Sequence, residues 1–435
     1  MYMLATLAST SHPTCRLPGG GFDEDVMSLT LRSLNATDAT CNDGTAASFY
    51  FRPCCDGATY EDWCNTSTTS RWFVVFGDGN SDGWCWDAES CAARAASTPS
   101  LTSSKGLPKY FRRDGARHTD AVGAFDKTGE QNPNFYKAYA AYVPHCSSDL
   151  FTGASPAGSS PSFRGNTIAK AALAAVRVEM EALGPPWEVV IVGGAGIVAS
   201  LPELRAALPA AAAVSAVCDG CVLLDLDLDT QQPPTHPHQR HRQQQQQQQG
   251  RGAAAVASGS ATTTTTPSCD KADAHSCPPA TTLPGAAKLW HASLRDDCGG
   301  WRCLLNATHH RPSDPSDPSS RSSSPLPLLA QQPLYDEQTA TAHATADAET
   351  LRAALLDSLS GADVVVASAC AGPSDAFTRS AFSTVSVGGG SIPPPTFASG
   401  LYALVTNGSR ALVDTCTGAG CNPTCKRGSS VVVES

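Results

Sequence analysis

The sequence predicts an α/β fold in which helices cover a mostly parallel central sheet. Short apolar runs typical of buried strands alternate with longer stretches of helical periodicity, and glycine-rich turns join the two. The composition agrees, because 41% of the 435 residues are hydrophobic and only 16% are charged. Helices that alternate with buried strands in this way call for a parallel sheet covered on both faces.

The first predicted strand covers residues 71–76, an aromatic and β-branched run that ends in the glycine-rich turn 77–83. Residues 164–183 form the first predicted helix, because apolar residues recur at helical spacing along one face. Gly184, followed by two prolines, ends this helix.

The pattern then repeats towards the C-terminus. Residues 187–192 predict a buried strand, residues 193–196 a tight glycine turn, and residues 201–208 a helix. Further on, a helical stretch at 346–359 precedes a short apolar strand at 362–368.

Two segments lack the apolar residues that a core needs. Residues 231–284 hold glutamine and threonine runs, and residues 312–327 are rich in serine and proline, so we expect both to be disordered insertions. The remainder predicts one domain, made of residues 41–230 and 285–425, behind an N-terminal extension of residues 1–40.

Charge and hydropathy exclude two classes of partner. The formal net charge is −10, and no cluster of Lys and Arg interleaved with aromatics occurs, so we expect no nucleic-acid partner. No apolar run reaches the roughly 18 residues that cross a bilayer, so we expect no membrane span.

Eighteen cysteines predict disulfides, because they are spread along the foldable parts instead of forming repeated CxxC pairs. Cys218 and Cys221 have the spacing of a zinc half-site, but no second pair matches them, so we predict neither a metal nor a cofactor. Three histidines in the glutamine tract could chelate a metal loosely, although a solvated tail explains them better: His236, His238 and His241.

The cysteine content also predicts export to an extracellular or cell-wall location. Four glycosylation sequons agree with export, at Asn35, Asn65, Asn306 and Asn407. The N-terminus does not show a clear signal peptide, because it lacks a basic segment and its apolar stretch is short.

The glycine turn after the strand at 187–192 admits two chemical interpretations. A dinucleotide fingerprint needs G-x-G-x-x-G, but Ala199 stands where the third glycine should be. A nucleophile elbow has the same strand, turn and helix, with a serine at the turn. The serine is absent here, because the turn contains Gly194.

Several segments, taken in order, resemble the pectin acetylesterase and Notum carboxylesterase family. They are CNDGT at 41–45, SDGWC at 81–85, NPNFY at 132–136, VPHCSSD at 143–149, FRG at 163–165, CDGC at 218–221, WRC at 301–303, LYDEQ at 334–338, and LVDTC with CNPTC at 412–425. The resemblance implies an α/β-hydrolase fold, a secreted disulfide-bonded protein and an ancestral reaction that hydrolyses carboxylic esters. It also implies a local disulfide between Cys85 and Cys91.

Ester hydrolysis of this kind uses a Ser–His–Asp triad and backbone donors for the oxyanion. By resemblance, Asp336 is the retained acid, whereas Gly194 and Pro373 stand at the nucleophile and histidine positions. The oxyanion hole would be formed by Gly83, Trp84 and Ala195.

Structural interpretations of the same residues stay open. Asp336 without its histidine is equally consistent with a loop carboxylate, and Gly83 with Trp84 is consistent with a tight turn beside a packed Trp. His145 is expected to be a packed or surface residue. Ser200 and Ser215 lie outside the elbow, so neither is expected to inherit the nucleophile's geometry.

Three functional hypotheses follow. The leading one is a catalytically impaired member of the family that binds an acylated polysaccharide or a lipidated protein in an inherited pocket. The first alternative is an active carboxylesterase with a substitute nucleophile. The second is an extracellular binding or structural module without a pocket ligand.

Overall fold

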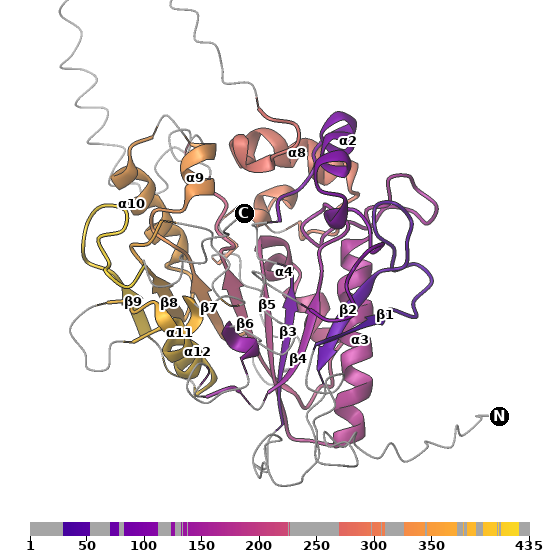
Figure 1. Cartoon of the computed structure of the whole chain (residues 1–435), viewed down its shortest axis with the longest axis horizontal. Helices are drawn as coiled ribbons and strands as arrows, with labels where there is room; N and C mark the ends of the chain where they lie inside the picture. Colours follow the sequence, from indigo (N-terminus) through magenta and orange to yellow (C-terminus); the bar gives the residue numbers. More distant parts are fainter. Residues whose placement is uncertain are drawn as a thin grey trace, which may run out of the picture.

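The computed structural model describes residues 29–52, 70–77, 82–111, 123–126, 132, 134–136, 138–224, 226, 269–296, 298–305, 307–308, 326–343, 346–371, 377, 381–388, 395–406, 408 and 410–425. These residues form a nine-stranded sheet in the order β1-β2-β4-β3-β5-β6-β7-β8-β9 (Figure 1). The second strand is antiparallel to both its neighbours, and every other neighbouring pair is parallel. The predicted fold class is confirmed.

The central strands are buried on both faces, as parallel strands covered by helices require. In β5 (Trp187–Gly193), Val189 and Ile191 pack into one apolar cluster while Val190 and Val192 pack into the other. The remaining strands are β1 (Thr30–Ser33), β2 (Ser48–Arg52), β3 (Ser70–Phe76), β4 (Tyr139–Val143), β6 (Ala213–Asp219), β7 (Leu328–Gln331), β8 (Val364–Ala367) and β9 (Arg410–Val413).

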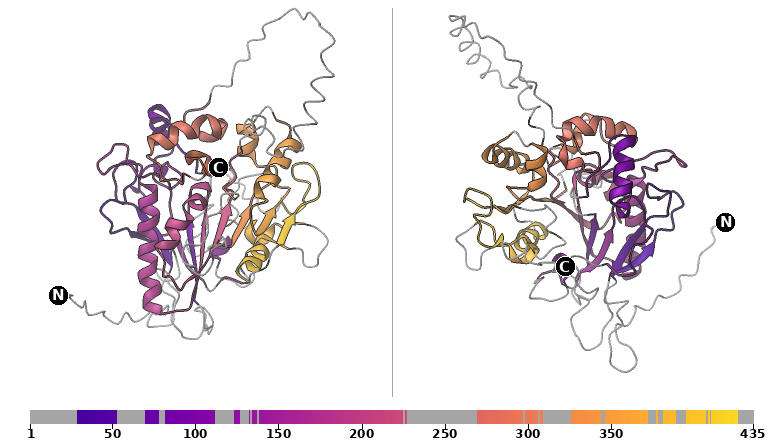
Figure 2. Two further views of the ribbon diagram at one scale, coloured as in Figure 1. Left: turned by 180° about the vertical axis from the view of Figure 1, so that it is seen from behind. Right: turned by 45° about the horizontal axis from the view of Figure 1, so that its top comes forward.

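Helices form a layer on each face of the sheet. One layer contains the long helix α3 (Gly165–Leu183), which lies in front of the sheet in the left view of Figure 2, with α4 (Ala195–Ala199), α5 (Leu201–Ala206) and α10 (Ala348–Leu359). The opposite layer contains α11 (Ala381–Thr384) and α12 (Phe397–Val405).

A third group of helices lies over the carboxyl ends of the parallel strands, at the top of Figure 1: α2 (Ala88–Ser97), α8 (Pro279–Leu289) and α9 (Glu337–Ala342). The α2 helix begins where it does because Asp87 and Ser90 form a capping box. Single 3₁₀ turns complete the described elements, at η1 (Pro99–Leu101), η2 (Gly123–Phe125), η3 (Ala274–Ser276) and η4 (Gly300–Leu304).

Two expected segment boundaries differ from the structure. Residues 29–40 are not a separate extension, because β1 pairs with β2 at the edge of the sheet. Residues 269–284 are not part of a disordered insertion, because they form η3 and most of α8. A local disulfide between Cys269 and Cys277 and the buried side chain of Leu283 stabilise this segment. The average composition of residues 231–284 conceals both features. The rest of that tract, and residues 312–325, lie outside the described residues.

Seven disulfides join cysteines of the described residues, which supports the disulfide interpretation. The bond between Cys85 and Cys91 that the resemblance implied is confirmed. Cys218 and Cys221 are bonded to each other, so they are not zinc ligands. Within the described residues, every helix is too short or too polar to cross a membrane.

Candidate active site

The expected site residues follow neighbouring strands of the parallel sheet. Gly83 and Trp84 follow β3, Gly194 and Ala195 follow β5, and Asp336 follows β7. Because the carboxyl ends of parallel strands meet at one edge, all of these residues lie at the same end of the sheet, where α/β proteins bind ligands. Pro373 follows β8 in the sequence but lies outside the described residues.

Strand β5, the turn at Gly194 and helix α4 follow one another as the elements of a nucleophile elbow do, but the backbone of the turn is not strained. Gly194 has φ −78° and ψ −168°, a conformation open to any residue, whereas an elbow is a sharp, strained turn. Ala195 is the fully buried first residue of α4. Gly196 packs closely on the loop that follows β4, so that a Cβ on Gly196 would lie 1.8 Å from the carbonyl oxygen of Leu150.

The loop at residues 82–84, which we call the oxyanion loop, requires its glycine. Gly83 has φ +64°, in the left-handed region, and a Cβ there would lie 3.3 Å from Arg94 Nη1. Trp84 is buried, and its Nε1 donates to Thr282 Oγ1 in α8 at 3.2 Å. The packed tryptophan agrees with the structural interpretation of this pair and leaves the oxyanion role a prediction.

Arg94 in α2 fixes the backbone of the oxyanion loop. Its guanidinium donates to the carbonyl oxygens of Asp82 and Gly83, and to Ser148 Oγ at 2.9 Å. Burial lowers the pKa of Arg94, while the charges of Asp82 and Asp273 raise it. A guanidinium normally stays protonated in proteins, so Arg94 holds the loop as a cation.

Asp336 is buried and caps α9. Its Oδ2 accepts hydrogen bonds from Thr339 N at 2.8 Å and Thr339 Oγ1 at 2.6 Å. This contact gives the backbone N–H of Thr339, in the first turn of α9, a hydrogen-bond partner, as aspartates at helix N-termini commonly do. A structural role for this carboxylate is therefore present, and its catalytic role stays a prediction.

A pocket joins the oxyanion loop to Asp336. The empty space at this site is about 340 Å³ when the adjoining open solvent is included, and Gly194 does not line it. Its wall is largely apolar, with polar groups at a few points. The lining residues are Trp84, Gly220, Val222, Leu223, Leu224, His275, Cys277, Pro279, Asp336, Gln338, Thr339, Ala342 and His343.

Two pocket histidines were not anticipated from the sequence. The ring of His275 meets the edge of Trp84 at 5.4 Å between centroids, and His343 Nε2 lies 3.2 Å from the carbonyl oxygen of Leu224. The sequence contains a weak indication for each of these two histidines. His275 lies inside the short Cys269–Cys277 loop, and His343 is seven residues after Asp336, which is two helical turns.

The other residues considered in the sequence analysis do not support a role in the pocket. Ser200 and Ser215 are buried and do not line it. His145 is packed, as expected, with a 2% exposed side chain. His236, His238 and His241 lie outside the described residues, and among the described ones no group of three or more His, Cys, Asp or Glu could hold a metal ion.

Comparison with known families gives a match over more than half of the chain. The family model described as Pectinacetylesterase matches residues 23–265. Among solved structures, the Wnt deacylase Notum from Drosophila superposes with a TM-score of 0.61 at 22% identity, and the match covers 92% of this chain and 99% of that one. This likeness supports the α/β-hydrolase-like fold.

Curated relatives match over a shorter stretch. The palmitoleoyl-protein carboxylesterase NOTUM of Mus musculus is 33% identical over 130 residues, which are 29% of this chain and 21% of that protein. The inactive palmitoleoyl-protein carboxylesterase notum1b of Danio rerio is 32% identical over 129 residues, which are 29% of this chain and 76% of that protein. The match thus spans about a fifth of the mouse protein and about three quarters of the zebrafish protein named as inactive.

Proposed function

Because the chain belongs to the pectinacetylesterase family, we propose that it binds an acylated ligand at the carboxyl edge of the sheet and hydrolyses it slowly or not at all. The observation that carries this proposal is the absence of a hydroxyl at Gly194, together with a pocket that Trp84 and Asp336 line at the same end of the sheet. An inactive relative of similar sequence makes such a loss of activity consistent with the family.

The missing groups are those that make and break bonds. A serine nucleophile needs a hydroxyl at the elbow and an imidazole to take its proton, and Gly194 and Pro373 supply neither. What can remain is electrostatic support of a carbonyl oxygen by backbone N–H groups, which polarises an ester without supplying a nucleophile.

The pocket supports an acyl group as the bound part of the ligand. Val222, Leu223 and Leu224 form an apolar wall, and Asp336 and the histidines provide polar groups at its margin. The relatives are named for removing palmitoleoyl groups from proteins, and the family for removing acetyl groups from pectin. We therefore propose an acylated polysaccharide or a lipidated protein as the partner.

The purified protein should bind acyl ligands without turning them over. We expect 4-nitrophenyl acetate hydrolysis to stay within about twofold of a heat-inactivated sample, because no nucleophile is placed at the elbow. Calorimetry with an acetylated oligosaccharide and a palmitoleoylated peptide should show heat of binding for at least one. Binding of neither would favour the structural-module hypothesis.

One observation favours an active esterase as the second candidate. His275 and His343 line the same pocket as Asp336, so an imidazole is present near the oxyanion loop. Turnover that exceeds the inactivated sample and disappears on His275→Ala or His343→Ala would establish this candidate and displace the first.

We also propose an extracellular location, supported by the disulfides. Asn35 is exposed and begins the sequon Asn35-Ala36-Thr37, so we expect it to carry an N-glycan when the chain is secreted from eukaryotic cells. Glycosidase treatment should increase mobility, and Asn35→Gln should abolish glycopeptides that contain residue 35 in mass spectra. An unmodified peptide in the secreted protein would contradict this prediction.

A further inference from the structure

The segment at residues 145–152, which we call the support loop, touches both halves of the candidate site. Ser148 accepts a hydrogen bond at its carbonyl oxygen from Cys85 N at 3.2 Å, directly after the oxyanion loop. Two residues later, the carbonyl oxygen of Leu150 lies against Gly196 in α4. The position of one half relative to the other therefore depends on the conformation of this short loop.

The support loop has an unfavourable backbone. Ser148, Leu150 and Phe151 have φ of 50°, 52° and 61°. These angles lie in the left-handed region, where the backbone of residues other than glycine is strained. Each such residue costs about 1 to 2 kcal/mol, so surrounding contacts must hold the loop in place.

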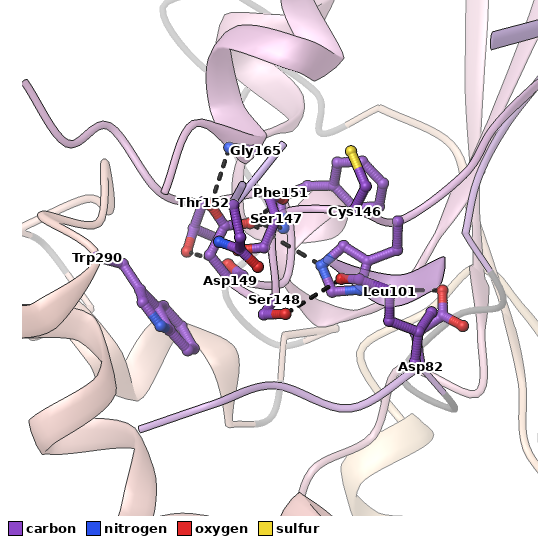
Figure 3. A network of polar contacts seen from close by, with 12 residues as sticks. Asp82, Leu101, Cys146, Ser147, Ser148, Asp149, Phe151, Thr152, Gly165 and Trp290 are labelled. Atoms are coloured by element: carbon purple, nitrogen blue, oxygen red, sulfur yellow. Dashed lines mark hydrogen bonds and ion pairs between the residues drawn. The ribbon is translucent and has the colours of Figure 1, made fainter. Parts of the chain in front are cut away.

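The buried carboxylate of Asp149 supplies those contacts. Its Oδ1 accepts from Ser147 Oγ at 2.6 Å and Phe151 N at 3.0 Å, and its Oδ2 accepts from Gly165 N at 2.8 Å. Figure 3 shows Asp149 between these partners, with Gly165 at the start of α3. Gly153 and Gly165 leave room for the carboxylate, because a Cβ on either would lie 2.1 Å from one of its oxygens.

His145 extends this network to the oxyanion loop. Its Nε2 lies 3.9 Å from Asp149 Oδ1 and its Nδ1 lies 3.9 Å from Asp82 Oδ2, and Asp82 directly precedes Gly83. Asp82 lies at the far side of the network from Gly165 in Figure 3. The imidazole, which also packs on Phe151, is thus placed between two carboxylates of different loops.

We propose that Asp149 is a positioning residue that sets the spacing between the oxyanion loop and the elbow, with His145 as its link to Asp82. The proposal rests on the proposed function, because the spacing matters only if this edge of the sheet binds a carbonyl or carboxylate. Asp149 is fully buried, so it acts through the support loop and does not touch a ligand.

Hydrogen exchange in the full chain tests the positioning role. Asp149→Asn replaces one oxygen with an NH₂ group that must face a backbone N–H, so we expect the amide of Cys85 to exchange at least about tenfold faster. Asp414→Asn is the matched control: Asp414 is buried, accepts from Ala369 N, Gly388 N and Asn422 Nδ2, and follows β9. Asp414→Asn should leave the exchange rate of the Cys85 amide unchanged. Unchanged Cys85 exchange in Asp149→Asn, or an equal rise in both variants, would overturn the proposal.

If Asp149→Asn does not fold, His145→Phe tests the link. Phenylalanine keeps the contact with Phe151 and removes two buried ring nitrogens that have no hydrogen-bond partner among the described residues. We expect Cys85 to exchange faster by about threefold, because the imidazole no longer lies between the carboxylates of Asp82 and Asp149. No change at Cys85 would overturn the link.

Calorimetry with octanoate and octanamide separates positioning from general destabilisation. Asp149→Asn should weaken the binding of octanoate by about tenfold and the binding of octanamide by less than about twofold. Backbone N–H donors contribute more to the binding of an anion than to the binding of a neutral amide. Equal losses for both ligands would overturn the positioning role. If the parent binds neither, the proposed function fails, and the exchange of Cys85 still decides whether Asp149 positions the loop.

Discussion

Restoring both missing side chains should restore measurable ester hydrolysis. We expect Gly194→Ser with Pro373→His to hydrolyse 4-nitrophenyl acetate about a hundredfold faster than the parent, while each single variant stays within about twofold of it. The effect is non-additive because a hydroxyl without a base is a poor nucleophile, and an imidazole without a hydroxyl has no proton to take. The backbone of Gly194 accepts a serine without strain.

Two further variants test the assigned roles. Gly194→Ala with Pro373→His is the matched control, because it has the new imidazole and lacks only the hydroxyl, so its rate should equal that of the parent. Adding Asp336→Asn to the restored protein should lower its rate by at least about tenfold, since the acid orients the histidine. A folded double variant with the parent's rate would contradict the placement of the elbow or the histidine loop.

Gly196→Ala should be the most destabilising single-methyl change at the candidate site. The new Cβ would meet the carbonyl oxygen of Leu150 at 1.8 Å and Thr152 Cγ2 at 2.8 Å, and a backbone atom cannot rotate away. Because α4 or the support loop must shift, we expect the free energy of unfolding to fall by about 3 kcal/mol. Urea denaturation followed by circular dichroism measures this change.

Gly285→Ala provides the matched control in a second helix. Gly285 lies in α8, where a Cβ would make only an ordinary contact at 3.5 Å with Trp86 O. Alanine is favoured over glycine in helices, so we expect the free energy of unfolding to rise by about 0.5 to 1 kcal/mol. A loss of equal size in both variants would show that the contact with Leu150 is not the cause.

The sequence alone predicted the parts of the fold that have strong local signals. Apolar runs located β3, β5 and β8, and helical periodicity located α3 and α10 within two residues of their observed starts. The shorter edge strand β1, with the sequence TLRS, has no such signal, because its position depends on pairing with β2. Ordered motifs identified the family, and the absence of Ser and His at their positions is visible without coordinates.

Only the tertiary structure brought together residues that are far apart in the chain. Trp84, His275 and His343 meet in one pocket, although more than two hundred residues separate the first from the last. Likewise, no local pattern indicates that the support loop contacts both the oxyanion loop and α4. Periodicity reports which face of an element is buried, whereas such contacts depend on how the elements pack, and packing is a property of the whole sheet.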